Sequence, residues 1–332
     1  MSGIPEVSGA RAGWSSPGAW RRLFRDRPML PLLALLVVLV VLSEVARPGI
    51  VKPSWAGVLF RAAVPLAILA ACQTLTMLTG GIDLSVGAVA SMAGFVVASL
   101  SASTGTTTGI VVALIAAAVA GLVTGIGVGV FRVHPLIMTL GMSLVVLGLA
   151  NFWQLQTAKT SSGVAPELRW IGSDAFADIV PYSLLVFVPL AVIILLGLRR
   201  TGYGRMLVAI GDNPMAARLS GARSWQILIV LYVISALLAA IAGFLYSGYT
   251  NVASVALVDS AVLPSVAAAV IGGTSIMGGR GGYGGTILGV LILTVISSLL
   301  SSLGYPEAVR QVLFGAIIVA VAAAYTRVTG ET

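Results

Sequence analysis

Long, uninterrupted apolar runs dominate this chain and decide what it can fold into. Of its 332 residues, 58% are hydrophobic and only 9% are charged, and the mean hydropathy is +1.05. A soluble domain carries charge on about a quarter of its residues, because its surface must be hydrated. A chain with so little charge needs hydrocarbon around it, where the backbone must satisfy its own hydrogen bonds within helices or closed barrels. Because the runs are continuous rather than alternating, we predict an all-α fold, a polytopic membrane helix bundle.

The number of membrane crossings follows from the lengths of the apolar runs. A helix needs about 20 apolar residues to cross about 30 Å of hydrocarbon. The sequence therefore predicts about ten transmembrane helices in one domain, residues 29–326. The expected crossings are 29–45, 55–78, 84–100, 109–131, 135–154, 180–198, 225–247, 261–277, 286–303 and 308–325.

The basic residues orient this bundle in a cell (plasma or inner) membrane. With a cytoplasmic N-terminus, ten crossings place thirteen of the nineteen basic residues inside, as the positive-inside rule requires. The remaining six would face outside: Arg47, Lys52, Arg61, Lys159, Arg169 and Arg310. We therefore expect a cytoplasmic tail at 1–28, an uncleaved first crossing, a basic cytoplasmic loop at 199–224 and a cytoplasmic C-terminal tail at 327–332.

Several chemistries are disfavoured by the composition. The net charge is +8, but the basic residues lie in short loops between apolar runs, so we expect membrane lipid around the chain and no nucleic acid partner. With a single cysteine, Cys72, and a single histidine, His134, we expect no metal site and no cofactor. The sequence lacks G-x-x-x-x-G-K-[ST], so we predict a transport subunit that is not itself an enzyme and leaves ATP hydrolysis to a partner.

One carboxylate stands between two apolar runs, in Leu78-Thr-Gly-Gly-Ile-Asp-Leu-Ser-Val-Gly87. Asp83 follows Gly80 and Gly81 and precedes Gly87. Such an acid can cap the helix that follows it by accepting backbone N–H bonds. A carboxylate at membrane depth is also costly and usually functional, so contact with a solute or a gating element is the alternative.

The basic inner loop contains helix signals of its own. Asp212 or Asn213 can cap, Pro214 suits the first helical position, and Gly221 can end the helix. We predict a short helix at about 214–220. A capped helix between two crossings is better explained as a docking element for a cytoplasmic partner than as a solvated loop.

A second glycine cluster runs from Gly272 to Gly285 and predicts a tight inner turn. It begins Gly272-Gly273-Thr274-Ser275, so two hydroxyls lie near the expected pathway end. Its literal G-x-G-x-x-G at 279–284 is flanked by apolar runs rather than by a strand and a soluble helix, which argues against a dinucleotide site.

Three segments in this order resemble the permease subunits of ribose-type, simple-sugar ABC importers. They are residues 79–87, residues 201–205 together with 213–221, and residues 267–281. The resemblance covers about residues 31–324. It implies a partner ATPase, a second permease copy or homologue, and an extracytoplasmic solute-binding protein. It also implies a coupling helix that contacts the ATPase, with Gly211, Asp212, Asn213, Pro214, Ala217, Arg218 and Leu219 as the coupling residues.

The expected function is ATP-driven import of a small sugar-like solute by alternating access. The expected pathway residues are Asp83, Asn151, Gln154, Thr274 and Ser275, and the expected structural glycines are Gly80, Gly81, Gly87, Gly272 and Gly273. The chain departs from the resembled family at residues 261–265 and at Leu147, where members carry charge, so the solute stays open among pentoses, hexoses, polyols and related polar compounds. The alternatives are a branched-chain amino-acid importer, a secondary transporter or channel, and an intramembrane enzyme.

Overall fold

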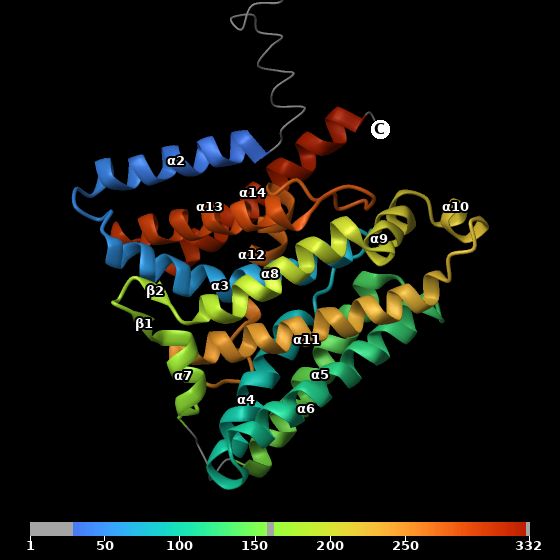
Figure 1. Cartoon of the computed structure of the whole chain (residues 1–332), viewed down its shortest axis with the longest axis horizontal. Helices are drawn as coiled ribbons and strands as arrows, with labels where there is room; N and C mark the ends of the chain where they lie inside the picture. Colours follow the sequence, from blue (N-terminus) through green and yellow to red (C-terminus); the bar gives the residue numbers. More distant parts are fainter. Residues whose placement is uncertain (1–28, 158–162, 330–332) are drawn as a thin grey trace, which may run out of the picture.

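The computed structural model describes residues 29–157 and 163–329, without the side chains of 318 and 320–329. The expected tail at 1–28, Lys159 and the last three residues lie outside the described part. Almost all of the described chain is helical, and Figure 1 shows the long helices gathered into one bundle. The helices are α2 (Met29–Ala46), α3 (Pro53–Met77), α4 (Val86–Thr104), α5 (Thr106–Gly129), α6 (Pro135–Thr157), α7 (Pro166–Ser173), α8 (Ser183–Arg200), α9 (Gly202–Asp212), α10 (Pro214–Leu219), α11 (Ser224–Thr250), α12 (Asp259–Ile271), α13 (Tyr283–Ser302) and α14 (Glu307–Thr329).

Eight of these helices are long and apolar enough to cross a membrane, which confirms a polytopic helical membrane protein. They are α2, α3, α4, α5, α6, α8, α11 and α13. The expected bounds of one crossing, 261–277, are wrong, because the helix there, α12, ends at Ile271 after 13 residues. At about 1.5 Å per residue such a helix is only about 20 Å long. The helix stops because Gly272 and Gly273 follow it, and Gly273 has a φ of +88°.

The last helix, α14, has the length of a crossing, with 23 residues. It continues through Thr329, past the expected start of the C-terminal tail at residue 327. Its first turn holds an ion pair between Glu307 and Arg310.

Helix α11 occupies the centre of the bundle and packs against α3, α4 and α5. The contact with α5 depends on glycines spaced four residues apart. A Cβ on Gly121 would lie 2.5 Å from the Tyr232 carbonyl oxygen, and one on Gly125 would lie 2.7 Å from the Ile229 Cα. Close backbone contact of this kind drives helix association in lipid, so these glycines let α5 and α11 pack directly against each other.

The two long loops lie at opposite ends of the bundle, as Figure 1 shows. Helices α9 and α10 form one end, and α7 lies at the other. Next to α7, the expected all-α fold needs a small correction. Strands β1 (Ala175–Phe176) and β2 (Val180–Pro181) pair antiparallel in a short hairpin. Its turn residues Ala177 and Asp178 have φ of +51° and +59°, which end any helix there.

Candidate coupling and translocation site

The loop between α8 and α11 folds into two helices instead of the one expected. Helix α9 begins where the Thr201 hydroxyl accepts the Gly204 N–H at 3.2 Å. The signal for this unexpected helix is local, a Thr201 N-cap directly before Gly202-Tyr203-Gly204. Helix α9 is amphipathic and buries Leu207 and Ile210 against the bundle.

Helix α10 forms where the capping signals predicted it. The Asn213 side chain accepts the N–H groups of Met215 at 3.1 Å and Ala216 at 3.0 Å, so Asn213 rather than Asp212 is the cap. Pro214 occupies the first turn, where a missing N–H costs nothing. Gly221 has a φ of +86° and follows the end of the helix, as expected.

The outer face of α10 has no partner within the described chain. Only Ala217 is buried, whereas Met215 is 64% and Leu219 is 82% exposed. Arg218 is also exposed, and no ion pair to it occurs among the described residues. A short, rigid helix that presents two large apolar side chains and a cation has the character of a docking surface.

The end of α9 joins both glycine clusters. A Cβ on Gly211 would lie 1.9 Å from the Leu78 carbonyl oxygen and 2.6 Å from the Gly279 nitrogen. The Gly279 N–H donates to that same Leu78 carbonyl at 3.0 Å. A Cβ on Gly279 would lie 3.0 Å from the Asp212 Cα. The end of α3, the end of α9 and the turn after α12 therefore meet at one point, directly before the α10 cap.

The second glycine cluster forms a tight turn, as its sequence predicted. The Ser275 N–H donates to the Arg280 carbonyl at 2.9 Å, and the Ser275 hydroxyl accepts the Met277 N–H at 3.2 Å. Thr274 is 2% exposed, and its Oγ1 has no hydrogen-bond partner among the described residues. A Cβ on Gly281 would lie 2.8 Å from this Oγ1. A side chain on Gly281 would thus collide with Thr274.

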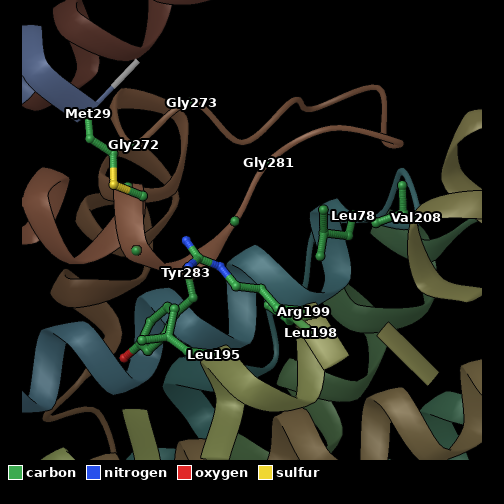
Figure 2. Close-up of a pocket in the computed structure, with 13 residues that line it drawn as sticks. Met29, Leu78, Leu195, Leu198, Arg199, Val208, Gly272, Gly273, Gly281 and Tyr283 are labelled. Carbon is green, nitrogen blue, oxygen red and sulfur yellow. The ribbon is translucent and has the colours of Figure 1, made fainter. Parts of the chain in front are cut away.

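A cavity of about 340 Å³ lies in front of this turn. Figure 2 shows Arg199 extending from α8 toward the strand-like segment that carries Gly281. The Tyr283 hydroxyl donates to the Ala67 carbonyl at 3.0 Å, which fixes the start of α13 against α3. The cavity is lined by Met29, Leu78, Leu195, Leu198, Arg199, Val208, Gly272, Gly273 and residues 281–285.

Asp83 is buried, at 2% exposure, and fully engaged. Its Oδ1 accepts the Ser85 N–H at 3.0 Å and the Ser85 hydroxyl at 2.6 Å. Its Oδ2 accepts the Ser235 hydroxyl of α11 at 2.8 Å. The expected capping role needs correction, because the N-cap of α4 is Ser85 and Asp83 lies two residues earlier. Ser235 is 152 residues away in sequence, and no local signal could have identified it.

Gln73 completes this buried polar cluster by bonding to the Asp83 backbone. The Gln73 Nε2 donates to the Asp83 carbonyl at 2.8 Å, and its Oε1 accepts the Asp83 N–H at 3.3 Å. The turn before α4 is thereby tied to α3 as well as to α11. This arrangement makes Asp83 a junction between three helices.

The other two expected pathway residues lie elsewhere. Asn151 and Gln154 are exposed on α6, and the Asn151 Nδ2 donates to its own helix at the Leu147 carbonyl, 2.9 Å away. The same helix exposes Leu144 at 71% and Leu149 at 61%. The structure therefore brings Thr274 and Ser275 together but leaves Asn151 and Gln154 on an outward face of the bundle.

The expected structural glycines all lie at turns or close contacts. Gly80 has a φ of +79° and Gly273 a φ of +88°, so both lie in the left-handed region that favours glycine. A Cβ on Gly87 would lie 2.4 Å from Val262 Cγ2, and one on Gly272 would lie 2.4 Å from the Thr286 nitrogen. A Cβ on Gly81 would meet Pro135 and the Tyr232 hydroxyl, both at 3.1 Å.

The opposite end of the bundle holds a more apolar cavity of about 790 Å³ beside α7. Glu167 lies at its edge and accepts the Thr106 hydroxyl at 2.8 Å. Hydrogen bonds from its own backbone N–H and from Thr106 hold the pKa of Glu167 below its usual value. Trp170 of α7 stacks on Tyr182, with ring centroids 4.7 Å apart.

Known proteins are similar in sequence to this chain along most of its length. The family model described as the permease component of branched-chain amino acid transport systems matches residues 56–322. The ribose import permease protein RbsC of Bacillus subtilis is 33% identical over 276 residues, 82% of this chain and 85% of that protein. The galactofuranose transporter permease protein YtfT of Escherichia coli is 34% identical over 266 residues, 78% of this chain and 76% of that protein.

The fructose import permease protein FrcC of Rhizobium meliloti is 32% identical over 262 residues, 76% of this chain and 72% of that protein. No solved structure matches. The resemblance to permeases of the ribose type is confirmed by these relatives, and the chain is a transport subunit. It belongs to the family of membrane permease components described for branched-chain amino acid transport systems.

Proposed function

We propose that this chain is the membrane subunit of an ATP-binding-cassette importer that moves a small sugar or sugar-like polar solute into the cytoplasm. Permeases named for ribose, galactofuranose and fructose support the solute class. The observation that carries the mechanism is the junction of Gly211, Leu78 and Gly279 beside the exposed helix α10. A partner that moves α10 would move both glycine turns with it.

In this mechanism the coupling residues divide into two groups. Met215 and Leu219 face outward and contact a cytoplasmic ATPase, and Arg218 lies at the inner edge of that contact, where it lines a cavity. Gly211 and Asp212 connect that contact to the bundle, while Asn213, Pro214 and Ala217 hold α10 in shape. ATP binding closes the ATPases, and the resulting displacement reaches the turns at Gly80 and Gly278 by direct backbone contact.

The remaining parts of the assembly follow from this assignment. A second permease copy or homologue covers the exposed face of α6 and completes the pathway with Asn151 and Gln154. An extracytoplasmic solute-binding protein docks near α7. The chain crosses the membrane ten times with both termini in the cytoplasm, and α12 with the turn after it forms an interrupted crossing, as in transporters whose broken helices line a binding site.

Reconstitution with the partner ATPase and the binding protein tests the proposal. We expect uptake of a sugar-like solute that requires ATP and the ATPase. The double variant Met215→Ser with Leu219→Ser should lose ATPase association, whereas Leu185→Ser, an exposed apolar residue on α8, should retain it. Uptake in vesicles without any ATPase would refute the mechanism and indicate a secondary transporter.

Branched-chain amino acids are the second candidate solutes, because the matching family model carries that description. The same vesicles distinguish the two classes when leucine, isoleucine and valine are compared with pentoses and hexoses. Uptake of leucine with no uptake of any sugar would overturn the sugar assignment and leave the ATP-coupled mechanism intact.

A further inference from the structure

A cavity at the base of α10 is surrounded by positive charge. It measures about 510 Å³, a size typical of pockets that hold small ligands. Three arginines from separate parts of the chain line it: Arg132 in the turn after α5, Arg218 in α10, and Arg223, which directly precedes α11. The full lining is Gly129, Val130, Arg132, Arg218, Ala222, Arg223, Ser224 and Trp225.

These guanidinium groups are not neutralised within the described part of the chain. Arg132, Arg218 and Arg223 are exposed, and their guanidinium groups make no hydrogen bond or ion pair with any residue that the structure describes. The lining contains no carboxylate. Three like charges around one cavity repel each other. An anion that enters the cavity is attracted by all three and relieves this repulsion.

A buried hydroxyl in the cavity wall also lacks a partner. Ser224 is 9% exposed, and its Oγ makes no hydrogen bond to any described residue. An unpaired buried hydroxyl costs free energy, and a hydroxyl donates readily to a phosphate or carboxylate oxygen. In the same wall, Arg132 has a φ of +56°, an unfavourable conformation for a residue with a Cβ. Both features suit a site that is completed by an anionic ligand.

The surroundings favour a ligand with an apolar tail. Two lining residues of the cavity are large and apolar, Trp225, which is 47% exposed, and Val130, which is 50% exposed. Val123 on α5 and Val230 on α11 are also exposed, at 45% and 46%, so both helices present apolar side chains to their surroundings. Tryptophan and arginine at the end of a membrane helix lie at headgroup depth, with acyl chains beside the apolar surface.

We propose that this arginine cavity binds the phosphate of an anionic phospholipid of the cytoplasmic leaflet and so connects α10 to the membrane surface. The proposal rests on the topology given under the proposed function, but it does not depend on the solute. Arg132, Arg223 and Ser224 hold the phosphate, and Arg218 joins it from the coupling helix. The lipid thereby holds the base of α10 in position while its outer face meets the ATPase.

Native mass spectrometry of the purified full-length chain, titrated with phosphatidylglycerol and with phosphatidylcholine, tests this site. We expect preferential binding of phosphatidylglycerol. Arg132→Gln with Arg223→Gln should weaken it about 10- to 30-fold, because each arginine near an anionic surface contributes about fivefold. Arg200→Gln with Arg205→Gln removes the same charge outside the cavity and should leave the affinity unchanged. Equal losses in the two double variants would overturn the proposal.

Ser224→Ala keeps all charges and gives an independent readout. Loss of its hydrogen bond should weaken phosphatidylglycerol binding severalfold, while phosphatidylcholine binding, as a measure of intact fold, should not change. An unchanged affinity for phosphatidylglycerol in Ser224→Ala and in the Arg132, Arg223 double variant would refute the site.

Two further arms identify the source of the anion. Inorganic phosphate should not displace phosphatidylglycerol, because it lacks the apolar tail; displacement at equal concentration would overturn the lipid as the ligand. The affinity of the Arg132, Arg223 double variant for the partner ATPase, measured in phosphatidylcholine nanodiscs, should equal that of the wild type. A loss of ATPase affinity with intact lipid binding would assign the cavity to the ATPase and refute the proposal.

Discussion

Replacing Gly211 by alanine should separate α9 from the two glycine turns. The new Cβ would lie 1.9 Å from the Leu78 carbonyl oxygen and 2.6 Å from the Gly279 nitrogen. Both contacts are with backbone atoms, so no side chain can rotate away. Ordinary contact begins at 3.4 Å, and the helix must move by about 1.5 Å to reach it.

The size of the effect follows from three contributions. Inserting a methyl group into a packed contact costs about 1–3 kcal/mol. Loss of the bond from the Gly279 N–H to the Leu78 carbonyl costs about 1 kcal/mol. Alanine in place of glycine within a helix stabilises that helix by about 1 kcal/mol. We therefore expect the variant to be destabilised by about 1–3 kcal/mol, with the displacement confined to the junction.

Gly197→Ala is the matched control for this change. Gly197 also lies in a helix, α8, but a Cβ there meets nothing within 4 Å. It should gain about 1 kcal/mol from helix propensity alone. The two variants should thus differ by about 2–4 kcal/mol in stability, since only Gly211 meets backbone atoms.

The assays are the apparent melting temperature and the amount of solute moved per ATP hydrolysed by the reconstituted complex. Gly211→Ala should lower both, and Gly197→Ala should lower neither. If Gly211→Ala melts no lower than Gly197→Ala and retains the coupling ratio, the junction does not carry the motion and the reasoning is wrong.

Three other substitutions test separate parts of the structure. Asn213→Ala removes the cap of α10 and should cost about 1 kcal/mol of local stability; hydrogen exchange of α10 should accelerate severalfold, and an unchanged rate would contradict the cap. Asp83→Ala leaves the hydroxyls of Ser85 and Ser235 without their acceptor and should destabilise the bundle by about 1–3 kcal/mol, whereas Asp83→Asn, which can still accept and donate, should melt close to the wild type. Gly243→Ala places a Cβ 1.9 Å from the Ala90 carbonyl oxygen and should lower the melting temperature of the bundle more than Gly197→Ala does.

The sequence predicted the elements whose signals are local. The limits of α10 follow from Asn213, Pro214 and Gly221, three residues whose backbone preferences act within one turn. Most crossings follow from hydropathy, because the membrane sets their length.

Other features depend on contacts between distant segments. The apolar run after Ala261 continues to Met277, so hydropathy alone extends the crossing, yet the backbone turns at Gly273. The bond from Ser235 to Asp83 joins α11 to the turn before α4. The same applies to the arginine cavity, whose three arginines come from separate turns and helices. The positive charges of these arginines can be read from the sequence, but their convergence on one cavity depends on how the helix ends pack.

The convergence of separate segments also explains why Gly211, Gly278 and Gly279 must lack side chains. A Cβ on Gly278 would lie 2.9 Å from the Gly211 Cα and 2.9 Å from the Gly80 nitrogen, so each turn fills the space that a side chain on another would need. Close-packed backbones of this kind are stiff, because no rotamer change can absorb a displacement. Under the proposed function, a push on α10 would therefore reach the turns after α3 and α12 with little loss. Flexible side chains at the same positions would weaken that transmission, and a single methyl group at Gly211 is enough to separate the packed backbones.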